Sequence, residues 1–168
     1  EGLRVAIVGD IVHSRVARSD LWGLTAMGAD VVMCGPPTLL PKHYEMLPGT
    51  WTTDIDAALD GADVVYALRI QRERQESGLF PSIREYTNCY GINRDRLALA
   101  RPEAVVMHPG PVNRGWELSD DLVDDERSLI LQQVAHGVAV RMATLYLTAG
   151  RDPGNLQVGR RDDAAAQV

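Results

Sequence analysis

Short apolar runs alternate with segments of helical spacing along most of this chain. Four of the runs are rich in valine and other apolar residues, and their lengths of four to six residues are typical of buried strands. They lie at residues 3–8, 30–33, 63–68 and 104–107. Because none of them shows the polar alternation of a sheet with one solvated face, we expect a parallel sheet that is covered on both faces.

Helical segments separate these runs. Residues 14–27 end at Gly28, residues 54–59 form a shorter segment, and residues 93–100 begin on an asparagine cap and stop before a proline. Right-handed crossovers between parallel strands then give a doubly wound, Rossmann-like α/β domain with three layers. The predicted strand order is 3-2-1-4-5, with the switch point beside the first strand.

A long final helix is predicted over residues 127–148. Two neighbouring stripes of mostly apolar residues at i+4 spacing make its apolar face wide, so we expect that face to pack against two partners. The stripes are Ile130, Val134, Val138, Met142 and Tyr146, and Leu131, Ala135, Ala139, Ala143 and Leu147. The domain is expected to span residues 1–150, and the polar residues 151–168 to form a disordered tail.

Composition narrows the class of protein. A chain of 168 residues, 45% of them hydrophobic, is long enough for one α/β domain with a proper core. Its formal net charge of −6 argues against binding to nucleic acid and to anionic membrane surfaces. Cys34 and Cys89 lack CxxC spacing, which predicts two buried thiols in a reducing compartment. Since the sequence has no long apolar segment and no secretory signal, the expected location is the cytoplasm.

Two arginines follow predicted strands. Arg15 is placed in the first turn of the first helix, where free backbone N–H groups favour an anion and a guanidinium can bind a carboxylate with two hydrogen bonds. The alternative is that Arg15 pairs with Asp10 as a loop brace. Arg69 interrupts an apolar run at its carboxyl end, where open α/β sheets bind ligands, and a buried arginine requires an anion. Gln71, two residues further on, can point the same way.

The third strand end carries the sequence His108-Pro109-Gly110-Pro111. Two prolines around a glycine remove N–H donors and stiffen the loop, so its carbonyl groups point in fixed directions. Such carbonyls suit the capture of an amino or amide group. The alternative is a rigid turn in which His108 is satisfied by a neighbour. Together, the three strand ends predict a crevice for a small dianion.

Other kinds of site find no support in the sequence. Residues 9–14 lack the GxGxxG pattern of a dinucleotide site, and there is no Walker motif. The histidines and carboxylates do not have metal-ligand spacing, and no serine or cysteine lies on a GxSxG elbow. His136, within the final helix, is interpreted as a helix-packing residue. We therefore expect neither a metal nor an organic cofactor.

Four segments in order carry a resemblance to a known family: VGDIVHSRVARS, LRIQRERQ, VMHPGPVNRG and LQQVAHGVAVRMA. Over about residues 2–149 the chain resembles the carboxyl-terminal half of aspartate carbamoyltransferase catalytic chains. The resemblance implies that Arg15 and Arg69 bind the carboxylates of L-aspartate and that Gln71 lies on the loop that closes over it. It also implies that the loop from His108 to Pro111 binds carbamoyl phosphate, with the carbonyls of Gly110 and Pro111 contacting its amide end.

Two details of the resemblance bear on specificity and packing. The related ornithine enzymes usually carry cysteine after the corresponding histidine, whereas this chain has Pro109. His136 stands where the family more often has asparagine.

The amino-terminal domain of the family, with its phosphate-binding loop, has no counterpart in this sequence. In the family the last helix packs on that domain, and a neighbouring subunit of a trimer completes each site. The resemblance implies transfer of the carbamoyl group to L-aspartate in pyrimidine biosynthesis, with this chain inactive when alone. Two alternatives stay open: a non-catalytic dianion-binding or regulatory module, and a transcarbamoylase for another amino acid.

Overall fold

The computed structural model describes residues 2–70 and 82–149. Residues Glu1–Val134 form one compact unit, and residues Ala135–Val168 form a second. The described part of the second unit is the continuation of the last helix. Gln71 and the predicted tail at 151–168 lie outside the described residues.

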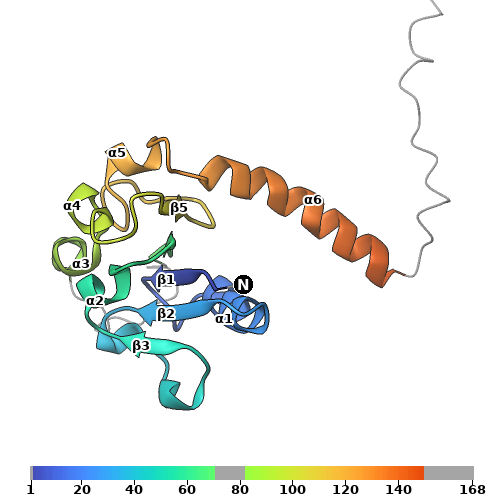
Figure 1. Ribbon diagram of the computed structural model, residues 1–168, viewed down its shortest axis with the longest axis horizontal. Helices are drawn as coiled ribbons and strands as arrows, with labels where there is room; N and C mark the ends of the chain where they lie inside the picture. Colours follow the sequence, from blue (N-terminus) through green and yellow to red (C-terminus); the bar gives the residue numbers. More distant parts are fainter. Residues whose placement is uncertain (1, 71–81, 150–168) are drawn as a thin grey trace, which may run out of the picture. The chain divides into compact units, whose positions relative to one another are not determined.

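A parallel five-stranded sheet organises the first unit (Figure 1). Its strand order is β3-β2-β1-β4-β5, which confirms the predicted order 3-2-1-4-5. The strands are β1 (Arg4–Val8), β2 (Asp30–Cys34), β3 (Thr50–Thr52), β4 (Val64–Ala67) and β5 (Val105–Met107). The four strands located from apolar runs are therefore all present, with small shifts at their ends.

Helices cover both faces of the sheet, as predicted. On one face, Val5 and Ile7 of β1 pack with α1 (Arg15–Ala26). On the other face, the alternate residues of β1 pack with side chains of three short helices, α2 (Ile55–Leu59), α4 (Arg94–Leu97) and α5 (Asp120–Val123). In Figure 1, α1 lies on one side of the strands and α2 and α4 on the other. The core is thus divided by the sheet into two apolar layers.

Side-chain caps define where the predicted helices begin. The hydroxyl of Ser14 accepts a hydrogen bond from the backbone N–H of Ala17 at 3.1 Å, at the start of α1. Asp54 caps α2 and Asn93 caps α4 in the same way. These are the polar residues at which the sequence pattern changes to helical spacing.

Several elements were not located from the sequence. These are β3, the helix α3 (Ile83–Tyr90), α5, and two 3-10 turns, η1 (Pro37–Leu39) and η2 (Tyr44–Met46). The prediction of two buried thiols is wrong for Cys89, which is exposed on α3. It is confirmed for Cys34, where burial raises the pKa of the thiol to about 12.

The last helix, α6 (Ile130–Thr148), begins three residues later than predicted. The preceding residues bind the backbone of β5 instead: Val106 donates to the carbonyl of Arg127 and accepts from Leu129, both at 2.9 Å. Many apolar side chains of α6 are exposed, including Val138, Met142 and Leu147. His136 is also exposed, so the packing role predicted for it is not found within the described residues. Neither α6 nor another helix in the described ranges combines the length and hydropathy needed to cross a membrane.

Candidate functional site at the carboxyl edge of the sheet

The three predicted strand-end segments leave neighbouring strands at the same edge of the sheet. Val8, the last residue of β1, is paired with Ala67 of β4, and Tyr66 of β4 is paired with Met107 of β5. The loops that begin at Gly9, Leu68 and His108 therefore start side by side. The three strand ends are therefore neighbours, as the predicted crevice requires.

Arg15 is the first residue of α1 and is exposed. The first turn of α1 contains no acidic residue, so its free N–H groups and the guanidinium both favour an anion. Asp10 is paired with His13 at 2.8 Å and accepts from the backbone N–H of the same residue. Within the described residues no ion pair joins Asp10 to Arg15, so the brace alternative finds no support.

Arg69 lies two residues after the end of β4 and is half-buried. Its two chain neighbours, Leu68 and Ile70, are each 1% exposed, so the backbone at this position is fixed by packing. The segment that carries Arg69 therefore starts at the same edge of the sheet as the loop that leads to α1. Gln71 cannot be placed, because it lies outside the described residues.

His108 is fully buried and both of its ring nitrogens are used inside the protein. The backbone N–H of Gly110 donates to Nδ1 at 2.8 Å, so Nδ1 is the unprotonated nitrogen and Nε2 carries the proton. Nε2 faces the carboxylate of Glu117 at 3.3 Å. The ring therefore holds the loop from within, as the rigid-turn alternative expected.

Glu117 is the residue that sequence reasoning missed. It is 1% exposed, accepts from the backbone N–H of Asn113 at 2.6 Å, and pairs with His108. The side-chain amide of Asn113 also donates to the carbonyl of Ile70 at 3.4 Å. These bonds tie the loop after β5 to the segment that carries Arg69. One signal was available: a buried histidine needs an acceptor, and Glu117 is the first acidic residue after it.

Gly110 has a backbone conformation that favours glycine. Its φ is +70°, and the Gly110–Pro111 peptide bond is cis. With prolines on both sides, the carbonyl directions of this loop are set by the backbone itself.

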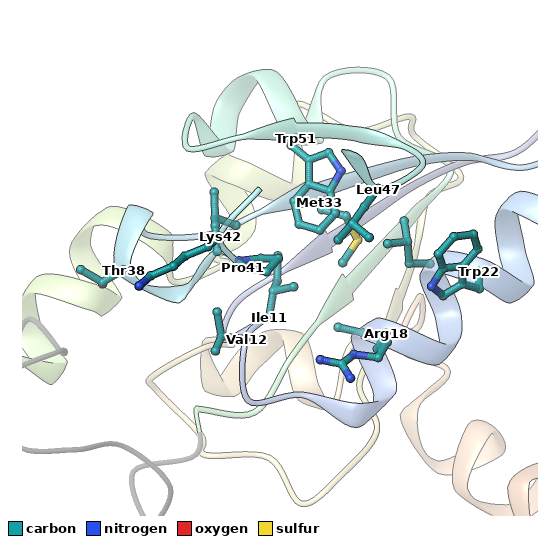
Figure 2. Close-up of a pocket in the computed structure, with 13 residues that line it drawn as sticks. Ile11, Val12, Arg18, Trp22, Met33, Thr38, Pro41, Lys42, Leu47 and Trp51 are labelled. Atoms are coloured by element: carbon teal, nitrogen blue, oxygen red, sulfur yellow. The ribbon is translucent and has the colours of Figure 1, made fainter. Parts of the chain in front are cut away.

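A separate pocket lies between α1, η1 and β3 (Figure 2). Its volume is about 660 Å³, and its wall is mostly apolar, with Trp22 from α1 and Trp51 from β3. Arg18 and Lys42 are its charged residues. None of the predicted site residues lines this pocket, although it shares the loop residues Ile11 and Val12 with the segment that leads to Arg15. No group of three or more potential metal-ligating side chains occurs in residues 2–70 or 82–149.

Comparison with known proteins points to one family. Residues 1–148 match the family described as aspartate/ornithine carbamoyltransferase, Asp/Orn binding domain. The chain is 59% identical over 150 residues to the aspartate carbamoyltransferase catalytic subunit of Pelotomaculum thermopropionicum, covering 89% of this chain and 48% of that one. The corresponding subunit of Acetivibrio thermocellus is 55% identical over 154 residues, covering 92% and 49%.

Solved structures agree with the fold. Ornithine carbamoyltransferase from Pyrococcus furiosus has a TM-score of 0.74 at 27% identity, over 90% of this chain and 51% of that chain. Aspartate transcarbamoylase from Trypanosoma cruzi, in complex with phosphate, has a TM-score of 0.69 at 26% identity, over 87% and 50%. The chain thus spans about half the length of the relatives that it matches.

Proposed function

The chain belongs to the aspartate/ornithine carbamoyltransferase family, as its Asp/Orn binding domain, and on that premise we propose that it is the aspartate-binding half of an aspartate carbamoyltransferase. The observation that carries the proposal is the position of Arg15 and Arg69 at the carboxyl ends of adjacent strands. Two guanidinium groups at one edge suit the two carboxylates of L-aspartate. The proposed reaction is a step of pyrimidine biosynthesis.

Three features favour aspartate over ornithine as the acceptor. A second amine would meet a guanidinium where L-aspartate presents its second carboxylate. Pro109 stands where the ornithine enzymes usually carry cysteine. The relatives at 59% and 55% identity are named aspartate carbamoyltransferases. Gln71 is proposed to assist on the loop that closes over the amino acid.

Carbamoyl phosphate is proposed to meet the loop from His108 to Pro111. The carbonyls of Gly110 and Pro111 accept from its amide group, while His108 and Glu117 hold the loop in place. The amine of aspartate attacks the carbamoyl carbon, a C–N bond forms, and phosphate leaves with the electrons of the broken C–O bond and with the proton that the amine loses. The protein contributes positioning and charge neutralisation, and positioning alone supplies about 7–11 kcal/mol in favourable cases.

The rest of the active site is proposed to come from an amino-terminal domain and from a neighbouring subunit. The amino-terminal domain supplies the phosphate-binding groups, and a homotrimer brings residues of a neighbouring subunit to each site. Two free cysteines and no disulfide in the described residues fit a reducing compartment, which supports a cytoplasmic location.

Replacement of the two arginines tests the proposal. Arg69→Leu and Arg15→Leu, each made in this chain combined with the amino-terminal half, should weaken binding of a bisubstrate mimic that carries a phosphonate and an aspartate moiety. We expect a loss of about 1.5–3 kcal/mol each, on the order of tenfold to a hundredfold, because a charged hydrogen-bond pair is removed. Isothermal titration calorimetry measures it.

The matched control is Arg18→Leu, an exposed arginine one turn further along α1. It should leave the affinity unchanged. Equal affinity of the Arg69→Leu protein and the parent for the mimic and for succinate would contradict aspartate binding at this edge and favour another amino acid.

A further inference from the structure

The side chain of Gln133 bridges the strand edge and the loop after β5. Its Oε1 accepts from the backbone N–H of His108 at 3.0 Å, and its Nε2 donates to the hydroxyl of Tyr66 at 2.8 Å. A backbone N–H can only donate, so the amide oxygen must face His108 and the amide nitrogen must face Tyr66. The orientation of Gln133 is therefore determined by its partners.

Tyr66, the second partner of Gln133, in turn lies near the first helix. The hydroxyl of Tyr66 accepts from Gln133, and the carboxylate of Asp20 on α1 lies close enough to that hydroxyl to influence its pKa. Burial, and then the negative charge of Asp20, raise the pKa of Tyr66, which keeps the phenol protonated as a donor. Both polar atoms of the Gln133 amide therefore have a partner in the correct sense.

Gln133 contacts the loop at the backbone N–H of His108. His108 is the first residue of the loop, and it is now held at its backbone N–H by Gln133, at Nδ1 by Gly110 and at Nε2 by Glu117. The residue after Gln133, Val134, is the nearest neighbour that a β-carbon on Gly110 would meet, at 3.9 Å. The first turn of α6 therefore backs the loop both by a hydrogen bond and by packing.

We propose that Gln133 is a positioning residue for the carbamoyl-phosphate loop, supported through Tyr66 by Asp20. Tyr66 lies three residues before Arg69, and Asp20 lies on the helix that begins at Arg15. The hydrogen bonds of Gln133 thus connect the loop to the strand that leads to Arg69, and Asp20 lies near that contact on the helix that begins at Arg15. The inference rests on the proposed function, because it assigns to that loop the carbamoyl-phosphate end of the substrate pair.

The test compares Gln133→Leu with the parent, each combined with the amino-terminal half. The variant removes both hydrogen bonds and leaves a buried N–H without an acceptor, so the KM for carbamoyl phosphate should rise about fivefold to thirtyfold. The KM for L-aspartate at saturating carbamoyl phosphate should change less than about twofold. Backbone amide exchange at His108 should become faster, as measured by NMR.

Two further variants separate positioning from a general loss of structure. Gln133→Glu keeps an oxygen that accepts from His108, and it should restore most of the carbamoyl-phosphate affinity. Gln132→Leu alters the exposed neighbour in the same turn and should have no effect. If Gln133→Glu is as impaired as Gln133→Leu, or if both leave the KM for carbamoyl phosphate unchanged, the proposal is wrong.

The variants of Gln133 and Arg69 distinguish the positioning role from the proposed function. If Gln133→Leu has no effect while Arg69→Leu weakens binding of L-aspartate, the positioning role is excluded and the proposed function stands. If the parent combination neither binds nor carbamoylates L-aspartate, the proposed function itself is excluded.

Discussion

At the scale of single residues, Asp20 is a carboxylate whose acidity is changed by its surroundings in the fold. Burial raises its pKa above the usual 3.8, and the hydrogen bond from Tyr66 offsets part of that rise. The folded protein therefore binds this proton more tightly than the unfolded chain does. Stability from this group is greatest below pH 3.8, falls as the pH rises towards the folded pKa, and stays lower above it.

Replacement of Asp20 by asparagine should remove the loss of stability that the buried carboxylate causes at neutral pH. Asp20→Asn keeps an oxygen that accepts from Tyr66, and at pH 7 the variant should have a larger free energy of unfolding than the parent. The difference should shrink as the pH falls towards 3.8. Urea denaturation between pH 7 and 4 measures it, with Ser19→Ala as the exposed neighbouring control. A difference that grows towards low pH would contradict the assigned direction of the pKa shift.

Some residues of the candidate site could be predicted from the sequence, and others could not. Arg15, Arg69 and the loop from His108 were predictable because each follows an apolar run and so stands at a strand end. Their partners were not. Glu117 and Gln133 lie 9 and 25 positions from His108, and the spacing of the sequence alone does not bring either of them to the loop. Only the tertiary fold makes them neighbours of the loop.

At the scale of elements, the site depends on a close approach between the ends of β1 and β4. Gly9 follows β1 with φ at +139°, and a β-carbon there would lie 3.0 Å from both Cβ and the carbonyl oxygen of Leu68. Gly9 also donates to the carbonyl of Cys34 at 2.9 Å, at the end of β2. A glycine at this point allows three strand ends to converge.

Gly9→Ala should therefore destabilise the fold by about 1–3 kcal/mol, since it adds both a clash and a strained φ. Gly23→Ala is the control, because Gly23 lies within α1 with no neighbour within 4 Å of its β-carbon position. Alanine there should stabilise the protein by about 1 kcal/mol through helix propensity. Both free energies follow from urea denaturation, and a neutral Gly9→Ala would show that the strand ends can separate without cost.

The elements that escaped prediction lack the pattern on which prediction depends. β3 is three residues long, lies at the edge of the sheet and is formed from threonine and tryptophan rather than an apolar run. Tyr86 is the buried residue of α3, so no apolar stripe marks that helix. The start of α6 was misjudged because residues 127–129 fit a helical pattern but pair with β5.

At the scale of the whole molecule, the chain is acidic and spans about half the length of the relatives that it matches. Because the chain carries a net charge of −6, the proposed anionic substrate would be attracted by local arginines rather than by the overall charge. The chain spans about half of each relative, and α6 has a wide set of exposed apolar side chains. By family resemblance, we expect that face to pack on the amino-terminal domain.

Turnover after recombination tests the central claim most directly. The chain would be mixed with the separately produced amino-terminal half of the Pelotomaculum thermopropionicum subunit, and N-carbamoyl-L-aspartate would be measured from labelled carbamoyl phosphate and L-aspartate. We predict product from the mixture, none from either half alone, and a large loss with Arg69→Leu. A mixture that associates and binds the bisubstrate mimic but forms no product would contradict the account and identify the chain as a non-catalytic dianion-binding module.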